Sequence, residues 1–192
     1  MNTKSISSIL HRWVFATVAL SLFSSSASAI DLTVFVGIQH PGQLTFQSTQ
    51  EGTSNFIKTF DPKTFGVYGA RLGHGKIIGG EHTFAYAPNF VDSTSHAFIY
   101  HSNLRIQAPL PVVKPYGTFG VGVVHSAGNP VTSFGTEFAL NYGGGVKLTP
   151  GPIGVNFDVR GYTLPRISVG GFHVQDHLNF IQVSAGVVFA FE

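Results

Sequence analysis

A strict alternation of apolar and polar side chains runs through the end of the chain. In residues 181–191 every second side chain is apolar, and most of those between them are small or polar. The apolar set comprises Ile181, Val183, Ala185, Val187, Phe189 and Phe191. A period of two residues is that of a β-strand with two different faces. The segment therefore predicts a strand with one apolar face.

The stretch VNFDVRGY, residues 155–162, adds charge to the same pattern. Three apolar residues alternate there with Asn156, Asp158 and Arg160. A strand in a soluble protein would turn these polar residues toward bulk water, whereas a strand in a membrane barrel would turn them toward the lumen. The rest of the chain must decide between the two.

Eight segments bounded by turn residues are predicted as strands. They cover residues 31–38, 64–72, 77–87, 95–107, 114–124, 135–148, 153–163 and 178–191. The connections between them alternate between longer and short, and the two notable long ones are residues 39–63 and 164–177. Long outer loops opposite short periplasmic turns are typical of outer-membrane barrels. We therefore predict an all-β fold, an eight-stranded antiparallel up-and-down transmembrane β-barrel.

The composition favours the same class. Charged residues make up 10% of the chain, against about 25% in an average soluble domain. No window after residue 29 has the continuous apolar run of a membrane helix. The chain has no cysteine, so no disulfide supports the fold. Apolarity spread over alternate residues of many strands fits a membrane barrel.

Residues 1–29 have the pattern of a cleaved signal peptide. Lys4 and Arg12 form a basic start, residues 13–23 a short apolar core, and Ala27 and Ala29 a small-x-small cleavage pattern. We expect residues 30–192 to form the barrel domain, exported through the periplasm to the cell outer membrane. This part carries 9 basic and 9 acidic residues. Such a neutral balance gives no support for a nucleic-acid partner.

Strand phase predicts a set of charged side chains that point into the barrel. These are Arg71, Glu81, Arg105, Glu137, Lys147, Asp158 and Arg160. Eight strands enclose a space just wide enough for side chains to fill, and an unpaired charge there would cost several kcal/mol. We therefore predict a salt-bridged network that fills the lumen. The least regular strand is 77–87, where His82 falls on the lipid side, and a bulge is expected there.

Four stretches resemble a known family. They are LNYGGGVKLTPGPIGVNFDVRGY at 140–162, YGARLGHGKIIGGEHTFAY at 68–86, KPYGTFGVGV at 114–123 and the terminal FIQVSAGVVFAF. They look like the small outer-membrane β-barrels related to the transmembrane domain of outer-membrane protein A and to outer-membrane protein X. The resemblance covers essentially the whole mature chain. It implies that Phe189 and Phe191 belong to a C-terminal signal for the barrel assembly machinery.

Two histidine patterns were weighed as reactive sites. YHSN at 100–103 superficially resembles the His-x-Ser-Asn stretch of lipid A deacylases, but His101 and Ser102 are adjacent in a strand and must face opposite sides. The possible metal ligands His40, His96, His125, His173, Asp176 and His177 lie in or near the loops. Because a glycine-rich loop imposes no ligand geometry, solvated histidines are the better interpretation. We expect no catalytic residue, no metal site and no cofactor.

These observations favour a non-enzymatic scaffold that presents extracellular loops, in surface interaction, adhesion or envelope integrity. The alternatives are a narrow pore and a lipid A modifying barrel enzyme. The expected partners are outer-membrane lipid and lipopolysaccharide, the barrel assembly machinery and an unknown extracellular partner. We expect a monomer.

Overall fold

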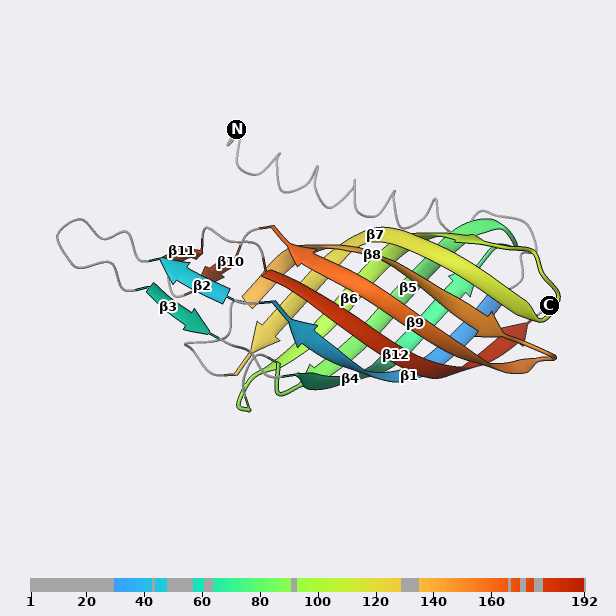
Figure 1. Cartoon of the computed structure of the whole chain (residues 1–192), viewed down its shortest axis with the longest axis horizontal. Coiled ribbons are helices and arrows are strands. Elements are labelled where there is room, and N and C mark those ends of the chain that lie inside the picture. Colours follow the sequence, from blue (N-terminus) through green and yellow to red (C-terminus); the bar gives the residue numbers. More distant parts are fainter. Residues whose placement is uncertain are drawn as a thin grey trace, which may run out of the picture.

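A computed structural model of the chain shows a closed β-barrel (Figure 1). It describes residues 30–42, 44–47, 57–60, 64–90, 93–128, 135–165, 167–169, 172–174 and 178–191. The predicted signal peptide, residues 1–29, lies outside these ranges and stays a prediction. Among the residues described, no helix is long and apolar enough to cross a membrane.

Eight antiparallel strands form the barrel. They are β1 (Ile30–Pro41), β4 (Phe65–His74), β5 (Ile78–Pro88), β6 (His96–Gln107), β7 (Val113–Ala127), β8 (Gly135–Leu148), β9 (Ile153–Leu164) and β12 (Leu178–Phe191). Each pairs with its neighbours along the barrel, and β1 pairs with β12 from Ile30 opposite Phe191 to Pro41 opposite Phe180. This last pairing closes the sheet, so no barrel strand is left as a free edge.

The predicted all-β, eight-stranded antiparallel barrel is confirmed. Two of the predicted segments, 135–148 and 178–191, coincide with β8 and β12, and the others differ by a few residues at their ends. The largest differences are in β1, which continues to Pro41 instead of ending at 38, and in β7, which continues to Ala127 instead of ending at 124. Alternation persists to this end of β7, where Val124 and Ser126 are buried and Val123 is exposed. The prediction ended this strand too early.

The two long connections contain short strands that the sequence analysis did not predict. Residues 39–63 include the end of β1 and the hairpin of β2 (Leu44–Gln47) and β3 (Ile57–Phe60). Residues 164–177 include the hairpin of β10 (Ile167–Val169) and β11 (Phe172–Val174). Both hairpins stand beyond the same end of the barrel, opposite the end that holds Phe191 (Figure 1). This is the extracellular end if, as in other outer-membrane barrels, the chain ends are periplasmic.

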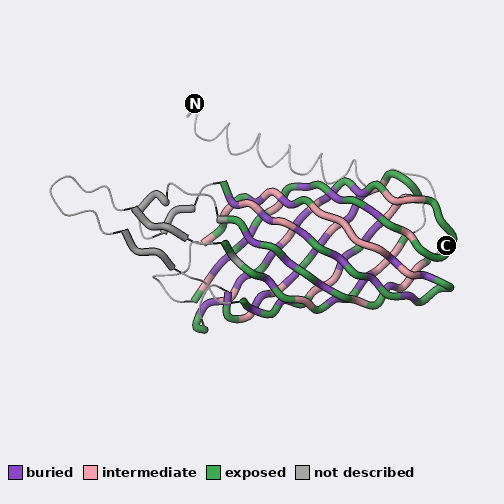
Figure 2. Tube along the Cα trace, viewed as in Figure 1, coloured by how far each residue is buried: buried purple, intermediate pink, exposed green. Residues whose placement is uncertain are grey.

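The barrel sorts its side chains by alternation, visible as buried and exposed steps along each strand (Figure 2). In β9 the side chains of Val155, Phe157 and Val159 are exposed, whereas Asp158 and Arg160 between them are buried. Exposed apolar residues recur on the outer faces of all eight barrel strands. In water such a surface would be unfavourable, but it suits the hydrocarbon of a bilayer.

The expected bulge near His82 is wrong. The register of β5 is continuous against both β4 and β6, and the phase keeps Glu81 and Thr83 buried. His82 therefore does lie on the outer face. Its ring nitrogen Nδ1 lies 3.0 Å from the Tyr100 hydroxyl, and the two rings stack. Because Tyr100 of β6 gives the His82 ring a polar partner, β5 keeps its phase although a histidine lies on the outer face.

The outer face can be tested with a charge placed at two depths. Val159, near the middle of β9, is 52% exposed, and Ile153, at its end, is 59% exposed. We expect Val159→Arg to cost about 2–4 kcal/mol of unfolding free energy in lipid vesicles, and Ile153→Arg about 0–1 kcal/mol. Urea unfolding followed by heat-dependent mobility in SDS measures both. Equal, small effects would mean that this face is in water.

Candidate functional site: the barrel interior

Arg160 organises a charged cluster near the middle of the lumen. Its Nε donates to Asp158 Oδ1 at 2.7 Å, and its Nη2 donates to Glu81 Oε1 at 2.7 Å. The three side chains are 0–2% exposed. Asp158 and Arg160 are two residues apart in β9 and share a face, while β5 brings Glu81 from across the lumen. The guanidinium thus ties together two strands that are not neighbours in the sheet.

Besides Arg160, Asp158 binds two further groups. Arg71 Nη2 of β4 lies 3.2 Å from Oδ1, and the Tyr116 hydroxyl of β7 donates to Oδ2 at 2.5 Å. Arg71 in turn donates to Ser184 and Asn156 and lies over the Phe35 ring. Two arginines and two carboxylates make this cluster neutral. Their mutual pairing offsets the cost of removing the charges from water.

A second cluster lies at the end of the barrel where β1 begins. Asp31 accepts from Arg105 Nη1 at 2.7 Å and from Lys147 Nζ at 2.5 Å. Gly73 of β4 pairs with Asp31, and a Cβ at this glycine would overlap the Arg105 guanidinium. The glycine therefore makes room for Arg105 to reach Asp31. This cluster has two cations for one carboxylate.

The structure divides the predicted charged residues between these two clusters and a third position. Arg71, Glu81, Asp158 and Arg160 meet in the central cluster, and Arg105 and Lys147 meet at the barrel end. Glu137 has the same inward phase but lies at the opposite end of β8 and is half-buried. Asp31 was not among the predicted inward charges. Its alternation with Thr33 and Phe35 in β1 could have placed it on the inner face.

The other half of the lumen is mainly apolar, although Gln39 and Gln182 are buried there as a hydrogen-bonded pair. Side chains from the extracellular ends of the strands pack there as a buried cluster, which includes Phe65, Val67, Ala87, Phe90, Ala97, Ile99, Val124, Leu164 and Phe180. Phe90 contacts Phe65 and Phe180 edge to face, with ring centroids 5.1 and 6.0 Å apart. Ions would have to cross this apolar section as well as the charged one.

The barrel separates the two residues of the YHSN stretch. His101 is fully buried and packs its ring against Tyr162, whereas Ser102 lies on the outer face. Ser102 is instead the cross-strand partner of His82. The sequence order along one strand could not predict this pairing, because it depends on the register between β5 and β6. The described residues of β5 and β6 bring no carboxylate to the outer face beside this pair.

The histidines considered as metal ligands do not form a site in the described part of the chain. No group of three or more potential ligands is found there. His40 and His125 instead lie within hydrogen-bonding distance of Thr64 and Thr136, and His96 packs against Phe98. The side chain of His173 and all of Asp176 and His177 lie outside the residues described.

Phe189 and Phe191 occupy the end of β12. Phe191 pairs with Ile30, and Phe189 pairs with Leu32 and Ile153. Both share the outward phase of the strand, with Phe191 56% exposed. Their role in assembly remains a prediction.

No family model and no curated protein sequence matches the chain. Among solved structures, Neisserial surface protein A matches with a TM-score of 0.62 at 12% identity, over 85% of this chain and 99% of that one. Outer membrane protein AlkL matches with a TM-score of 0.53 at 14% identity, over 88% and 94%. The outer membrane enzyme PagL matches at 0.42 and 15% identity, over 83% and 98%, too distant to bear on activity.

The apolar outer surface and the closed eight-stranded sheet define an outer-membrane β-barrel protein. The two likenesses with the higher TM-scores show the same fold, that of the small outer-membrane barrels. At this identity they carry no information on what the protein binds. Its particular role must be argued from its own residues.

The central cluster can be tested by removing its most connected carboxylate. In Asp158→Asn, two arginines are left to share Glu81, and we expect unfolding to become easier by about 3–5 kcal/mol. Adding Arg71→Met should recover part of this loss, because the remaining charges then pair one to one. Urea unfolding of both variants and of Arg71→Met alone measures the coupling. Strictly additive losses would show that the pair does not interact.

Proposed function

We propose that this protein is a non-enzymatic outer-membrane barrel that acts as a rigid scaffold for its extracellular loops. The observation that carries the proposal is the contrast between the two parts of the chain. The lumen is filled with paired charges and apolar side chains, whereas the two longest connections form hairpins beyond the rim. Binding residues often lie on loops that a rigid frame positions.

The filled lumen is the main argument against a pore. Arg71, Glu81 and Arg160 have side chains only 0–2% exposed, which means that they occupy the cross-section and leave little water around it. The apolar section adds a second barrier, because an ion would lose its hydration there. Both sections support a structural role for the interior charges.

The two hairpins offer a shared outer surface. β11 lies beside β2, so that residues from the first and last long connections come together although they are far apart in sequence. A partner could therefore contact both hairpins at once. We propose that these loops serve adhesion, surface interaction or envelope integrity.

The proposal can be tested by deleting each hairpin. In one variant a short Gly-Ser turn replaces residues 44–60, and in another it replaces residues 167–174. Both should still assemble and keep the heat-dependent shift in SDS, because the barrel pairings are unchanged. Attachment of expressing cells to immobilised host and bacterial surfaces should fall to the level of cells without the protein. A matched control substitutes Gly and Ser in the short turn at 109–111.

Loss of attachment in the hairpin variants alone would support the scaffold. Attachment that survives both deletions would move the function to the barrel wall and contradict the proposal.

Conductance separates the scaffold from the narrow pore. We expect the wild-type protein in planar bilayers to give no steady current, since both lumen sections are filled. Reproducible current steps that change size in Arg160→Gln would contradict this expectation and favour a pore. Heat-dependent mobility of the same samples shows that the protein added was folded.

A lipid-modifying enzyme is a second candidate. It is supported by the position of His82 directly opposite Ser102 on the lipid-facing side of the sheet. A histidine and a serine there could act as base and nucleophile on a lipid ester. Against it, the ring nitrogen Nδ1 of His82 is engaged by the Tyr100 hydroxyl and no carboxylate of β5 or β6 supports the pair. Mass spectra of lipid A and phospholipids should be identical with wild type, His82→Ala and Ser102→Ala. A product that is lost in both variants would establish the enzyme.

A further inference from the structure

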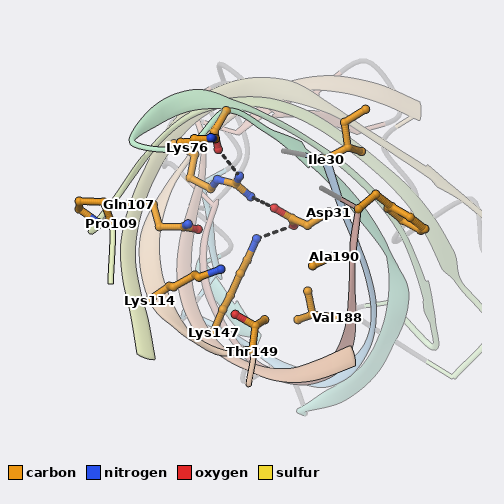
Figure 3. Close-up of a pocket in the computed structure, with 13 residues that line it drawn as sticks. Ile30, Asp31, Lys76, Gln107, Pro109, Lys114, Lys147, Thr149, Val188 and Ala190 are labelled. Carbon is orange, nitrogen blue, oxygen red and sulfur yellow. Dashed lines mark hydrogen bonds and ion pairs between the residues drawn. The ribbon is translucent and has the colours of Figure 1, made fainter. Parts of the chain in front are cut away.

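The barrel has a cavity of about 400 Å³ at the end that holds Ile30 and Phe191. Its polar lining comes from Asp31 of β1, Lys76 of the β4–β5 turn, Arg105 of β6, Lys114 of β7 and Lys147 of β8. Figure 3 shows Asp31, Lys76, Lys114 and Lys147 around the open mouth, with Lys114 and Lys147 extending into it. Both ends of the barrel chain lie here, which makes this the periplasmic mouth.

The charges of this mouth do not balance. Four cationic side chains and one carboxylate line the cavity. Asp31 is already bound to Arg105 and Lys147. Lys76 and Lys114 have no ion pair with any carboxylate of the described residues. Among the described residues that line the cavity, three positive charges therefore remain in excess around a small space.

Lys114 and Lys147 are direct cross-strand partners in β7 and β8. Like charges in this position repel and destabilise a sheet. Lys147 is only 3% exposed, so water screens the repulsion poorly. An anion between the two ammonium groups would convert this repulsion into two attractions.

Thr149 contributes an unpaired hydroxyl next to the lysines. It lines the cavity from the chain just after β8 and is 6% exposed, yet its hydroxyl has no hydrogen-bond partner. The buried hydroxyls of Thr118 and Ser126 are unpaired too, so this hydroxyl counts as an available donor and not as a sign of a bound group. Figure 3 places the Thr149 hydroxyl on the same side of the cavity as Lys147. It could donate a hydrogen bond to an oxygen held by the lysines.

We propose that the periplasmic mouth binds a compact oxyanion with two or more negative charges, of the phosphate or pyrophosphate type. The ammonium groups of Lys114 and Lys147 supply the charge, the Thr149 hydroxyl supplies a directed donor, and Lys76 adds attraction at the rim. The volume suits a small solute. Because the buried cations Arg105 and Lys147 of the lining lie inside the lumen, the ligand comes from the aqueous periplasm. This site does not involve the extracellular hairpins, so a failed test of the scaffold leaves this proposal unaffected, and the reverse also holds.

The first test is calorimetric titration of the folded barrel in phosphatidylcholine nanodiscs with pyrophosphate. We expect saturable binding, weakened about tenfold in Lys114→Gln and a few-fold in Thr149→Val, as loss of a charge-assisted and a neutral hydrogen bond would give. Lys58→Gln is the matched control, since it removes the same charge from β3, outside the barrel. It should bind like the wild type. Equal weakening in Lys58→Gln, or none in Lys114→Gln, would overturn the proposal.

Thermal unfolding of the same samples controls for folding. Without pyrophosphate, Lys114→Gln should unfold at the wild-type temperature or above it, because the repulsion with Lys147 is removed. With pyrophosphate, the wild type should gain stability while the variant gains little. An equal gain in both would contradict a site that includes Lys114.

Nanodiscs containing phosphatidylglycerol distinguish a soluble anion from a lipid headgroup. In the absence of pyrophosphate, this lipid should leave the stability difference between wild type and Lys114→Gln unchanged. If phosphatidylglycerol stabilises only the wild type and pyrophosphate does not bind, the phosphate belongs to lipid and the proposed luminal ligand is wrong.

Discussion

The antiparallel pairing of β1 with β12 is the interaction on which the rest of this structure depends. It joins the first and last strands of the barrel over twelve residue pairs and leaves no edge strand in the sheet. In a bilayer, where water cannot satisfy free backbone groups, this closure allows the strands to cross at all. Closure also creates two environments, lipid outside and a narrow lumen inside. Because of that separation, one face of each strand contacts lipid and the other face fills the lumen.

Two kinds of side chain fill the lumen. Toward the periplasm, arginines, a lysine and carboxylates pair across the barrel, and Asp158 joins Arg71, Arg160 and Tyr116. Toward the outside, aromatic and aliphatic side chains pack without charge. The paired charges hold opposite walls together and the apolar section closes the passage. A stable, filled barrel follows from both.

The two ends of the barrel differ in chemistry because different constraints act on them. At the outer end the chain leaves the wall in long connections with their own hairpins, which can vary without disturbing the barrel pairings. At the periplasmic end short turns bring Lys76, Lys114 and Lys147 around one small mouth. The proposed surface contact and the proposed anion site therefore lie at opposite ends of the barrel. A rigid wall keeps the two independent.

The sequence by itself determined the eight barrel strands, apart from a few residues at their ends, and their faces, since a period of two residues is a local property. The inward phase of Arg71, Glu81, Asp158 and Arg160 follows from it. Only the tertiary structure decided which groups meet. Asp31 joins Lys147 across 116 positions of sequence. The histidine that faces Ser102 is His82 of the neighbouring strand and not the adjacent His101. These contacts depend on the register between strands and on closure of the barrel. Both are set by backbone pairing around the whole sheet, which no single segment contains.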